Sequence, residues 1–419
     1  MTGLMLLIFA GLLILALPVG YALIISSGIA VITVGGSPSV VAIVKLFQPT
    51  QSFPLLAIPF FILSGNIMMG GVLGKKLIEF ATAIVGRFHG GLGQVGVVGS
   101  TIFGGVSGSA VAEASALGTM LIPWQKKEGY PPAFGAASIA AASTIAGLIP
   151  PSIALILYAT VSSQSIAALF LAGVLPGLML CTGFMLVCYF SGRLRNFPRL
   201  SEVLTVRRVL KISIAALPAL VMPIFIVVLL RAGIATPTEV SVVAVAYGLL
   251  VSGLLYRDLT MQRIYQALVG TCVTTGVVML VIMASNLVGY VLVVENVPAT
   301  VAQWVMETLK SPVLVIVMMN FIMLFVGMFL DLPAAILLLA PTFVAMGNSI
   351  GMDPVQLGVM MTINLSIGLF TPPVGTTLFI TAAISREPVG RIVKELLPFY
   401  AVAVTVLLLF SYVPALTVY

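Results

Sequence analysis

Asp331 is the residue whose type and surroundings most directly indicate binding chemistry. It stands in an apolar stretch, FVGMFLDLPAA, and no basic residue lies within twenty positions on either side. A carboxylate in the middle of a membrane segment costs ~2.5–3.5 kcal/mol on an insertion scale, so it needs compensation. A bound cation, helped by carbonyls at a helix break, is the simplest partner, and a distant arginine is the alternative. Glu113 is a second candidate for this role, or it faces water.

The hydroxyl residues of the chain fit a sodium ion better than a proton relay. Sodium prefers hard oxygen ligands, whereas a proton relay usually contains several buried acids or histidines. The single histidine, His89, lies beside Gly90 and Gly91 in a predicted loop. We therefore expect sodium, with two ions, bound by carbonyls, one carboxylate and the hydroxyls of Ser107, Ser109, Ser152, Thr371 and Thr376.

The elements that must position these residues occur twice. Pro150-Pro151 in GLIPPSIAL and Pro372-Pro373 in GLFTPPVGTTL are 222 residues apart. The same offset links the pairs Gly129 and Gly351, Pro132 and Pro354, Pro176 and Pro398, Gly105 and Gly327, and Ser109 and Asp331. The sequence thus predicts two copies of one unit, each with an apolar helix broken by Pro-Pro. Paired interrupted helices indicate the binding site of a transporter.

Composition assigns the chain to the membrane. Hydrophobic residues make up 60% of the 419 residues and charged residues 7%, and the mean hydropathy is +1.22. Apolar runs of 17 or more residues recur, and each is long enough to cross a hydrocarbon core of ~30 Å. We expect an all-α polytopic membrane protein. The net charge of +7 comes from bases in short loops, so it does not indicate nucleic-acid binding. The cysteines fit packing better than disulfides or ligands.

The distribution of basic residues predicts the orientation. Six basic residues and one acid, Glu202, lie between Arg193 and Lys211, so this loop is expected in the cytoplasm. Following the chain from there places residues 129–132 inside and residues 351–354 outside. The two copies would then have inverted topology, which is typical of secondary transporters.

Each copy also contains a stretch that fits a re-entrant hairpin. Residues 91–125 lie between two loops predicted to be cytoplasmic, and residues 312–350 between two external ones. Irregular backbone at a hairpin tip must be buried in protein or line a wet cavity. The broken helices are expected at 131–166 and 355–385. The predicted divisions are 1–52, an N-terminal scaffold helix with an external loop; 53–190, the first repeat; 191–270, the basic loop and scaffold helices; and 271–419, the second repeat.

Several motifs together resemble one family, over essentially the whole chain. They are IPFFILSGNIM (58–68), FGGVSGSAVAEASALG (103–118), GLIPPSIALILYA (147–159), GIATPTEVSVVAVAY (233–247) and GLFTPPVGTTLF (368–379). They look like the large membrane subunit of TRAP transporters, the tripartite ATP-independent periplasmic transporters of DctM or SiaM type. The resemblance implies an elevator mechanism, in which two hairpins and two broken helices slide along a scaffold under a sodium gradient.

The resemblance also implies site residues. The first sodium site would use Ser107, Gly108, Ser109, Gly147 and Pro150. The second would use Gly327, Asp331, Gly368, Thr371 and Val374. The substrate would lie between the two tips, with Ser152, Thr376 and Thr377 as candidate contacts. No arginine falls clearly at that level, so the charged contact to an anionic substrate is not assigned.

The implied activity is sodium-coupled uptake of a small carboxylate, such as a C4-dicarboxylate, sialic acid or keto acid, across a bacterial inner membrane. The implied partners are a periplasmic binding protein and a small four-helix membrane subunit, expected as a separate chain. No cofactor besides Na⁺ is expected. A sodium/divalent-anion symporter that needs no binding protein is the alternative. An enzyme is not expected, because one histidine and scattered cysteines cannot assemble a catalytic group.

Overall fold

The chain folds entirely into helices over the residues that the computed structural model describes, which are 1–15, 17–33, 39–200 and 205–419. The first helices are α1 (Thr2–Ile14), α2 (Val19–Thr33), α3 (Ser39–Phe47), α4 (Ala57–Met69), α5 (Val72–Val85), α6 (Gly91–Ser107), α7 (Ala110–Lys127), α8 (Pro132–Ala142), α9 (Ile153–Ser162) and α10 (Ile166–Leu194). They are followed by α11 (Val206–Arg231), α12 (Pro237–Leu250), α13 (Met261–Val294), α14 (Val297–Leu309), α15 (Pro312–Gly327), α16 (Leu332–Ser349), α17 (Pro354–Gly368), α18 (Thr376–Ser385) and α19 (Val389–Tyr412). Short helical turns join some of them, including η1 (Gln48–Gln51), η3 (Ser143–Gly147) and η4 (Val251–Leu255).

Six helices of the described chain are long and apolar enough to cross a membrane, or seven spans if the bent pair around residue 52 counts as one. They include α10 and α13, and also α11 and α12, which match the spans expected beside the basic loop. The prediction of an all-α multi-pass membrane protein is confirmed. Part of the basic loop, residues 201–204 with Glu202, lies outside the described residues.

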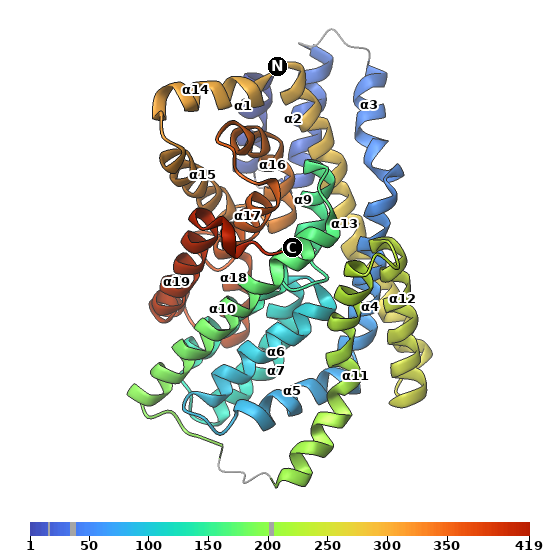
Figure 1. The fold of residues 1–419 in the computed structure, drawn as a ribbon, viewed down its shortest axis with the longest axis vertical. Helices are drawn as coiled ribbons and strands as arrows, with labels where there is room; N and C mark the ends of the chain where they lie inside the picture. The colour runs from blue at the N-terminus through green and yellow to red at the C-terminus, as the bar shows by residue number, and fades with distance from the viewer. Residues whose placement is uncertain (16, 34–38, 201–204) are drawn as a thin grey trace.

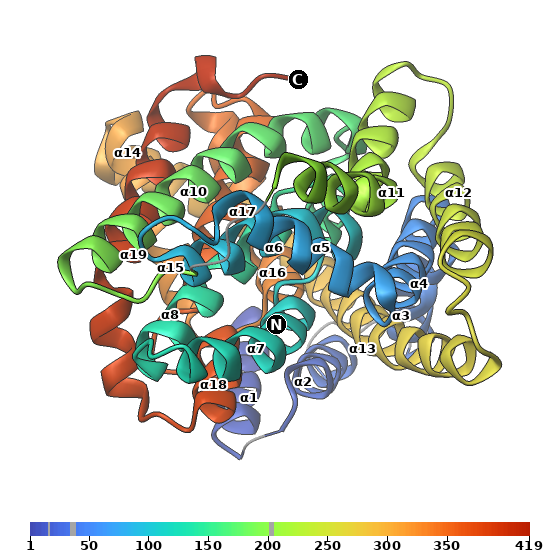
Figure 2. The same cartoon turned by 90° about the horizontal axis from the view of Figure 1, so that it is seen from below.

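The helices gather on two sides of the molecule. Figure 1 shows α3, α4, α11, α12 and α13 along one side and α17, α18 and α19 on the other, with α6 and α7 between them. The view from below in Figure 2 agrees with this arrangement. The side of α3, α4 and α11–α13 is called the scaffold side below.

Helix bounds in the two halves of the chain correspond at the offset found in the sequence. Shifted by 222 residues, the bounds of α7 become those of α16, and the bounds of α9 fall within one residue of those of α18. Helical structure stops at both Pro-Pro pairs, between η3 and α9 and between α17 and α18, and both Pro-Pro bonds are cis. The sequence offset therefore corresponds to an offset in the arrangement of elements.

The corresponding elements pack crosswise. Helix α9, which follows the first Pro-Pro pair, packs against α16 of the second half, and α18, which follows the second pair, packs against α7 of the first half. Exchanging each helix for its counterpart leaves this pattern unchanged. The two breaks are thus held together at the centre by contacts that each half makes to the other.

The N-terminal region differs from the expected single helix and loop. Residues 1–52 contain three helices, α1, α2 and α3, followed by η1. The sequence from Thr2 to Thr33 is apolar with no charged residue, so hydropathy alone does not separate α1 from α2. The separation comes at Pro18, because proline favours the start of a helix over its interior.

Candidate functional site

The first site begins at the turn between α6 and α7, here called tip 1 and comprising residues 104–109. Gly108 ends α6 with φ of 61°, a left-handed conformation that favours glycine. Ser109 then caps α7, and its hydroxyl accepts a hydrogen bond from the amide of Ala112 at 3.4 Å. The sequence SGS therefore reverses the chain within two residues and leaves backbone groups at the turn.

Tip 1 lies directly against the first broken helix. A Cβ atom on Gly104 would lie 2.8 Å from Cα of Ala146, and one on Gly108 would lie 2.2 Å from the carbonyl oxygen of Pro151. Backbone meets backbone at both positions, which is a contact that only glycine permits. The residues predicted for the first sodium site are thus brought to one place, with tip 1 facing the segment from Gly147 to Pro151.

The second half repeats this close approach. Gly327, the last residue of α15, touches Gly368, because a Cβ on Gly368 would lie 2.4 Å from the carbonyl carbon of Gly327. Gly368 is 222 residues from Ala146, so the two contacts occupy equivalent positions. The turn from Gly327 to Leu332, which joins α15 to α16, is called tip 2 below.

Tip 2 also reaches the first broken helix. A Cβ on Gly147 would lie 3.2 Å from Cδ2 of Leu332 and 3.1 Å from Oγ of Ser366. The predicted residues of the two sites, which are more than two hundred positions apart in sequence, therefore share one central region.

Glu113 is the fully buried carboxylate of this region. Its side chain has 0% exposure, its Oε1 accepts a hydrogen bond from the Ser107 hydroxyl at 3.0 Å, and its Oε2 has no hydrogen-bond partner. No basic residue of the described chain forms an ion pair with it. Of the two alternatives for Glu113, exposure to water does not hold. A buried carboxylate with one free oxygen beside a hydroxyl can complete a cation site.

Asp331 lies immediately before α16 and is exposed. Its side chain does not cap that helix, and it forms no ion pair with any described residue. Of its expected companions, Thr371 donates its hydroxyl to the carbonyl of Ile367 at 2.6 Å, and Val374 is 42% exposed. The carboxylate is therefore free of protein partners, as a cation ligand would be in the absence of its ion.

The three candidate substrate contacts differ in what they have available. Ser152 is buried, donates to the carbonyl of Gly147 at 2.5 Å and accepts from the amide of Leu155 at 3.2 Å. Thr377 is buried and donates to the carbonyl of Leu369 at 2.9 Å. The hydroxyl oxygen of Thr376 is buried without a partner. In this conformation only the Thr376 hydroxyl is uncommitted.

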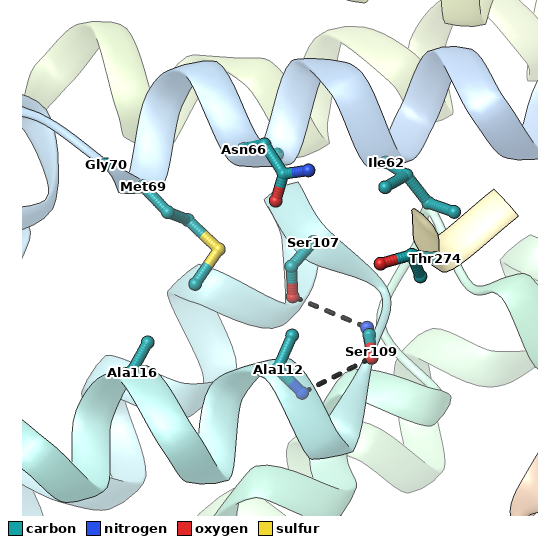
Figure 3. Close-up of a pocket in the computed structure, with 10 residues that line it drawn as sticks. Ile62, Asn66, Met69, Gly70, Ser107, Ser109, Ala112, Ala116 and Thr274 are labelled. Atoms are coloured by element: carbon teal, nitrogen blue, oxygen red, sulfur yellow. Dashed lines mark hydrogen bonds between the residues drawn. The ribbon is translucent and has the colours of Figure 1, made fainter. Parts of the chain in front are cut away.

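A cavity of about 280 Å³ separates tip 1 from the scaffold side. It is lined by Ser107 and Ser109 of tip 1, by Asn66 and its neighbours on α4, and by Thr274 on α13. Figure 3 shows Asn66 and Ser107 approaching each other across this space. The cavity, called the tip cavity below, is thus a small space with several hydroxyls and one amide. Ser152, Thr376 and Thr377 do not line it.

The motif IPFFILSGNIM sets the scaffold wall of the tip cavity. A Cβ on Gly65 would lie 3.1 Å from Cα of Ser107, so glycine allows α4 to approach tip 1 closely. The Asn66 amide donates to the Thr271 hydroxyl of α13 at 3.0 Å, which joins α4 to α13. The roles of Asn66 and Thr274 were not predicted. Position within the SGN motif was a signal for Asn66, but nothing local distinguishes Thr274.

Metal chemistry of the zinc type has no candidate here, since the described residues contain no group of three His, Cys, Asp or Glu side chains placed to hold a metal. Two of the cysteines, Cys181 and Cys188, are buried, whereas Cys272 is exposed on α13, so packing does not account for all three. His89 lies in the turn before α6 and contacts Arg199. None of these residues lines the tip cavity.

The whole chain matches a known family. The family described as "Tripartite ATP-independent periplasmic transporter, DctM component" matches residues 6–416. Among solved structures, the YdaH transporter of Alcanivorax borkumensis is similar in fold, with a TM-score of 0.59 and 15% identity, covering 88% of this chain and 84% of that one.

Named relatives agree with the family. The C4-dicarboxylate TRAP transporter large permease DctM of Pseudomonas aeruginosa is 37% identical over 89% of this chain and 87% of its own. The 2,3-diketo-L-gulonate large permease YiaN of Escherichia coli is 33% identical over 98% of both chains. The sialic acid large permease SiaM of Vibrio cholerae is 33% identical over 97% of this chain and 95% of its own. The chain therefore belongs to the DctM family, the large membrane permeases of tripartite ATP-independent periplasmic transporters.

Proposed function

We propose that this permease takes up a small carboxylate together with sodium ions across the bacterial inner membrane. The observation that carries the proposal is the pairing of a carboxylate with each tip. Glu113 is buried behind tip 1 with a free oxygen, and Asp331 precedes α16 without an ion partner among the described residues. A cation at each tip would compensate both charges.

The coupling ion is proposed to be sodium, with no other cofactor. The ligands near tip 1 are the hydroxyls of Ser107 and Ser109, the Glu113 carboxylate and the backbone around Gly147. Near tip 2 they are Asp331 and the backbone of Gly327 and Gly368. Each positive charge that enters down a 100 mV potential contributes ~2.3 kcal/mol, so two ions can drive accumulation of an anion.

The movement is proposed to be an elevator of two inverted repeats. The carrying body would contain the helix pairs α6–α7 and α15–α16 and the broken helices α8–α9 and α17–α18. Support comes from the crosswise packing of α9 on α16 and of α18 on α7, which ties the two halves into one body. The scaffold would contain α4, α11, α12 and α13, in contact with tip 1 across the tip cavity.

The substrate is proposed to be a carboxylate, of which C4-dicarboxylates, sialic acid and a diketo sugar acid are named for relatives. The relatives are TRAP transporter permeases, and on that ground a periplasmic binding protein and a separate small membrane subunit are proposed as partners. The tip cavity and the uncommitted Thr376 hydroxyl are the candidate substrate contacts.

Transport by the reconstituted complex tests this function. The permease would be placed in liposomes with the small subunit encoded beside it. Radiolabelled succinate, N-acetylneuraminate and 2,3-diketo-L-gulonate would be offered with and without the neighbouring binding protein. Uptake that needs both an inward sodium gradient and the binding protein is expected. Uptake without the binding protein would favour the symporter alternative, and uptake independent of sodium would contradict the proposed coupling.

A further inference from the structure

A second and larger cavity lies between the scaffold side and the carrying body, away from tip 1. Its volume is about 530 Å³, against about 280 Å³ for the tip cavity. Its walls come from α3 and η1, from the C-terminal half of α13, and from α9 and α16. The polar residues that matter for the argument are Lys45, Gln48, Ser52, Ser285, Asn286 and Tyr290. It is called the Lys45 cavity below.

Lys45 gives this cavity a positive charge that no acid neutralises. Its ammonium lies 3.2 Å from Oε1 of Gln48 and 5.6 Å from the ring centroid of Tyr290, so a neutral amide and an aromatic face hold it. No Asp or Glu lines the cavity, and no described carboxylate forms an ion pair with Lys45. An ammonium held only by neutral groups keeps its capacity to bind an anion.

A buried hydroxyl without a partner lies in the same wall. Ser285 is 4% exposed, and its Oγ has no hydrogen-bond partner, although the residue lines the cavity. Its neighbour Asn286 donates to the carbonyl of Lys45 at 2.5 Å, which fixes α3 against α13. A buried donor left unpaired costs ~1–3 kcal/mol, so a ligand oxygen that accepts from Ser285 would recover that loss. An ammonium and a free hydroxyl together are groups that bind a carboxylate.

The two cavities are at different depths along one scaffold helix. Thr274 of α13 lines the tip cavity, and Ser285 of α13 lines the Lys45 cavity. Eleven helical residues correspond to about 16 Å along the helix axis. With the proposed orientation, α13 runs outward from the basic residues at its start. The Lys45 cavity is then the external one.

We propose that the Lys45 cavity is a carboxylate-binding site on the external side, with Lys45 as the charged contact and Ser285 as a hydrogen-bond donor. The inference rests on the proposed function, for which it supplies the charged anion contact that neither tip provides. Lys45, Ser285 and Asn286 belong to the scaffold side, whereas the opposite wall belongs to α9 and α16 of the carrying body. An incoming carboxylate would therefore meet a fixed cation before the carrying body moves.

Thiol labelling tests the charge of the cavity without requiring transport. Ser52→Cys would be made in a Cys272→Ala background, because Cys272 is the exposed native cysteine and the other two are buried. The purified protein would react with the anionic reagent 2-sulfonatoethyl methanethiosulfonate and with its cationic trimethylammonium analogue. The anionic reagent is expected to react faster, by about tenfold relative to the cationic one, since a charged cavity concentrates ions of opposite sign. Lys45→Gln should remove that preference and Lys45→Arg should restore it.

Thr300→Cys is the matched control, because Thr300 is exposed on α14 and does not line the cavity. Its reagent preference should not change with Lys45→Gln. An absence of preference at Ser52→Cys, a preference that survives Lys45→Gln, or no labelling at all would overturn the proposal. Uptake by the wild-type complex is measured separately, so a failure of the proposed function would appear there and not in the labelling.

Discussion

At the scale of single residues, two carboxylates without ion partners among the described residues distinguish this site from an ordinary membrane interior. A lone carboxylate could be predicted from the sequence at Asp331, because it is surrounded by apolar residues and lies far from any base. The burial of Glu113 could not be predicted, since it depends on a hydrogen bond from Ser107 that forms only when the chain reverses at Gly108. The six residues between them would otherwise place these side chains on different faces of one helix.

Asp331→Asn should weaken the sodium dependence of uptake while the protein still folds and inserts, because it removes the formal charge at tip 2. The sodium concentration for half-maximal uptake is expected to rise about tenfold or more, which corresponds to ~1.4 kcal/mol of lost ion binding. Asp331→Ala should be at least as damaging. Glu307→Gln, a change of an exposed acid on α14, is the control and should leave the sodium curve unchanged. An unaltered curve for Asp331→Asn would remove Asp331 from the ion site.

Glu113→Gln keeps the shape of the buried side chain and removes its charge. If Glu113 binds a cation as a carboxylate, the variant should lose part of the stabilisation that sodium gives the purified protein. Thermal unfolding in detergent, with sodium replaced by potassium as the reference, measures this loss. The opposite result, full stabilisation by sodium in the variant, would mean that Glu113 is a neutral hydrogen-bond partner of Ser107.

At the scale of elements, the helix breaks follow from the sequence because Pro-Pro and SGS act locally. The helical structure that ends near Gly147 and the helix pair at tip 1 fall within the ranges predicted from these motifs. The scaffold wall could not be placed from the sequence, because Asn66 and its partner Thr271 are 205 residues apart. Contacts of that range depend on tertiary packing and carry no local pattern.

Gly108→Ala should impair uptake by displacing tip 1. The added Cβ would lie 2.2 Å from the carbonyl oxygen of Pro151, and alanine at φ of 61° is strained by ~1–2 kcal/mol. Gly276→Ala on α13 is the matched control, because nothing lies within 4 Å of its added Cβ. Uptake rates at equal amounts of membrane-inserted protein compare the two. Equal activity of the two variants would show that close contact at tip 1 is not required.

Asp258, in the turn between η4 and α13, joins α5 to the scaffold side. Its Oδ2 accepts from the Val72 amide at 2.6 Å and pairs with Arg263 at 2.6 Å. Burial raises the pKa of Asp258, but the hydrogen bonds from Val72 and Arg263 outweigh it and leave the pKa below its usual value. This contribution to stability is present above the unfolded-state pKa of ~3.9 and is lost as pH falls through the lower folded-state value.

Asp258→Asn should therefore destabilise the protein by ~1–3 kcal/mol at neutral pH. Thermal unfolding in detergent at several pH values would measure the effect, and the difference from wild type should shrink only as the pH falls below ~4. A difference that disappears near pH 6 would assign the effect to another group.

At the scale of the whole molecule, the account predicts opposite orientations for two equivalent turns. A cysteine at Met352 should react with an impermeant thiol reagent from outside the cell, and one at Glu128 only from inside. Both would be made in the Cys272→Ala background. Labelling of both from the same side would remove the inverted topology on which the elevator proposal depends.

The stroke of the movement follows from the spacing of the two cavities on α13. Thr274 and Ser285 face the carrying body at positions about 16 Å apart along the helix. The tips should therefore travel a distance of that order when they pass from the tip cavity to the Lys45 cavity. The offset of the repeats could be predicted from the sequence, but this distance could not, because it depends on which face of α13 meets each cavity.

The most direct test of the account is a set of distances between spin labels in the reconstituted complex. Labels on Ala112 beside tip 1 and on Phe329 in tip 2 would report on the carrying body, and a label on Val242 of α12 would report on the scaffold; all three positions are exposed. Between sodium-free and sodium-plus-substrate conditions, the Ala112–Phe329 distance should stay constant, while both distances to Val242 change by several ångströms or more. A tip-to-tip distance that changes as much as the tip-to-scaffold distances would contradict the movement of the tips as one body.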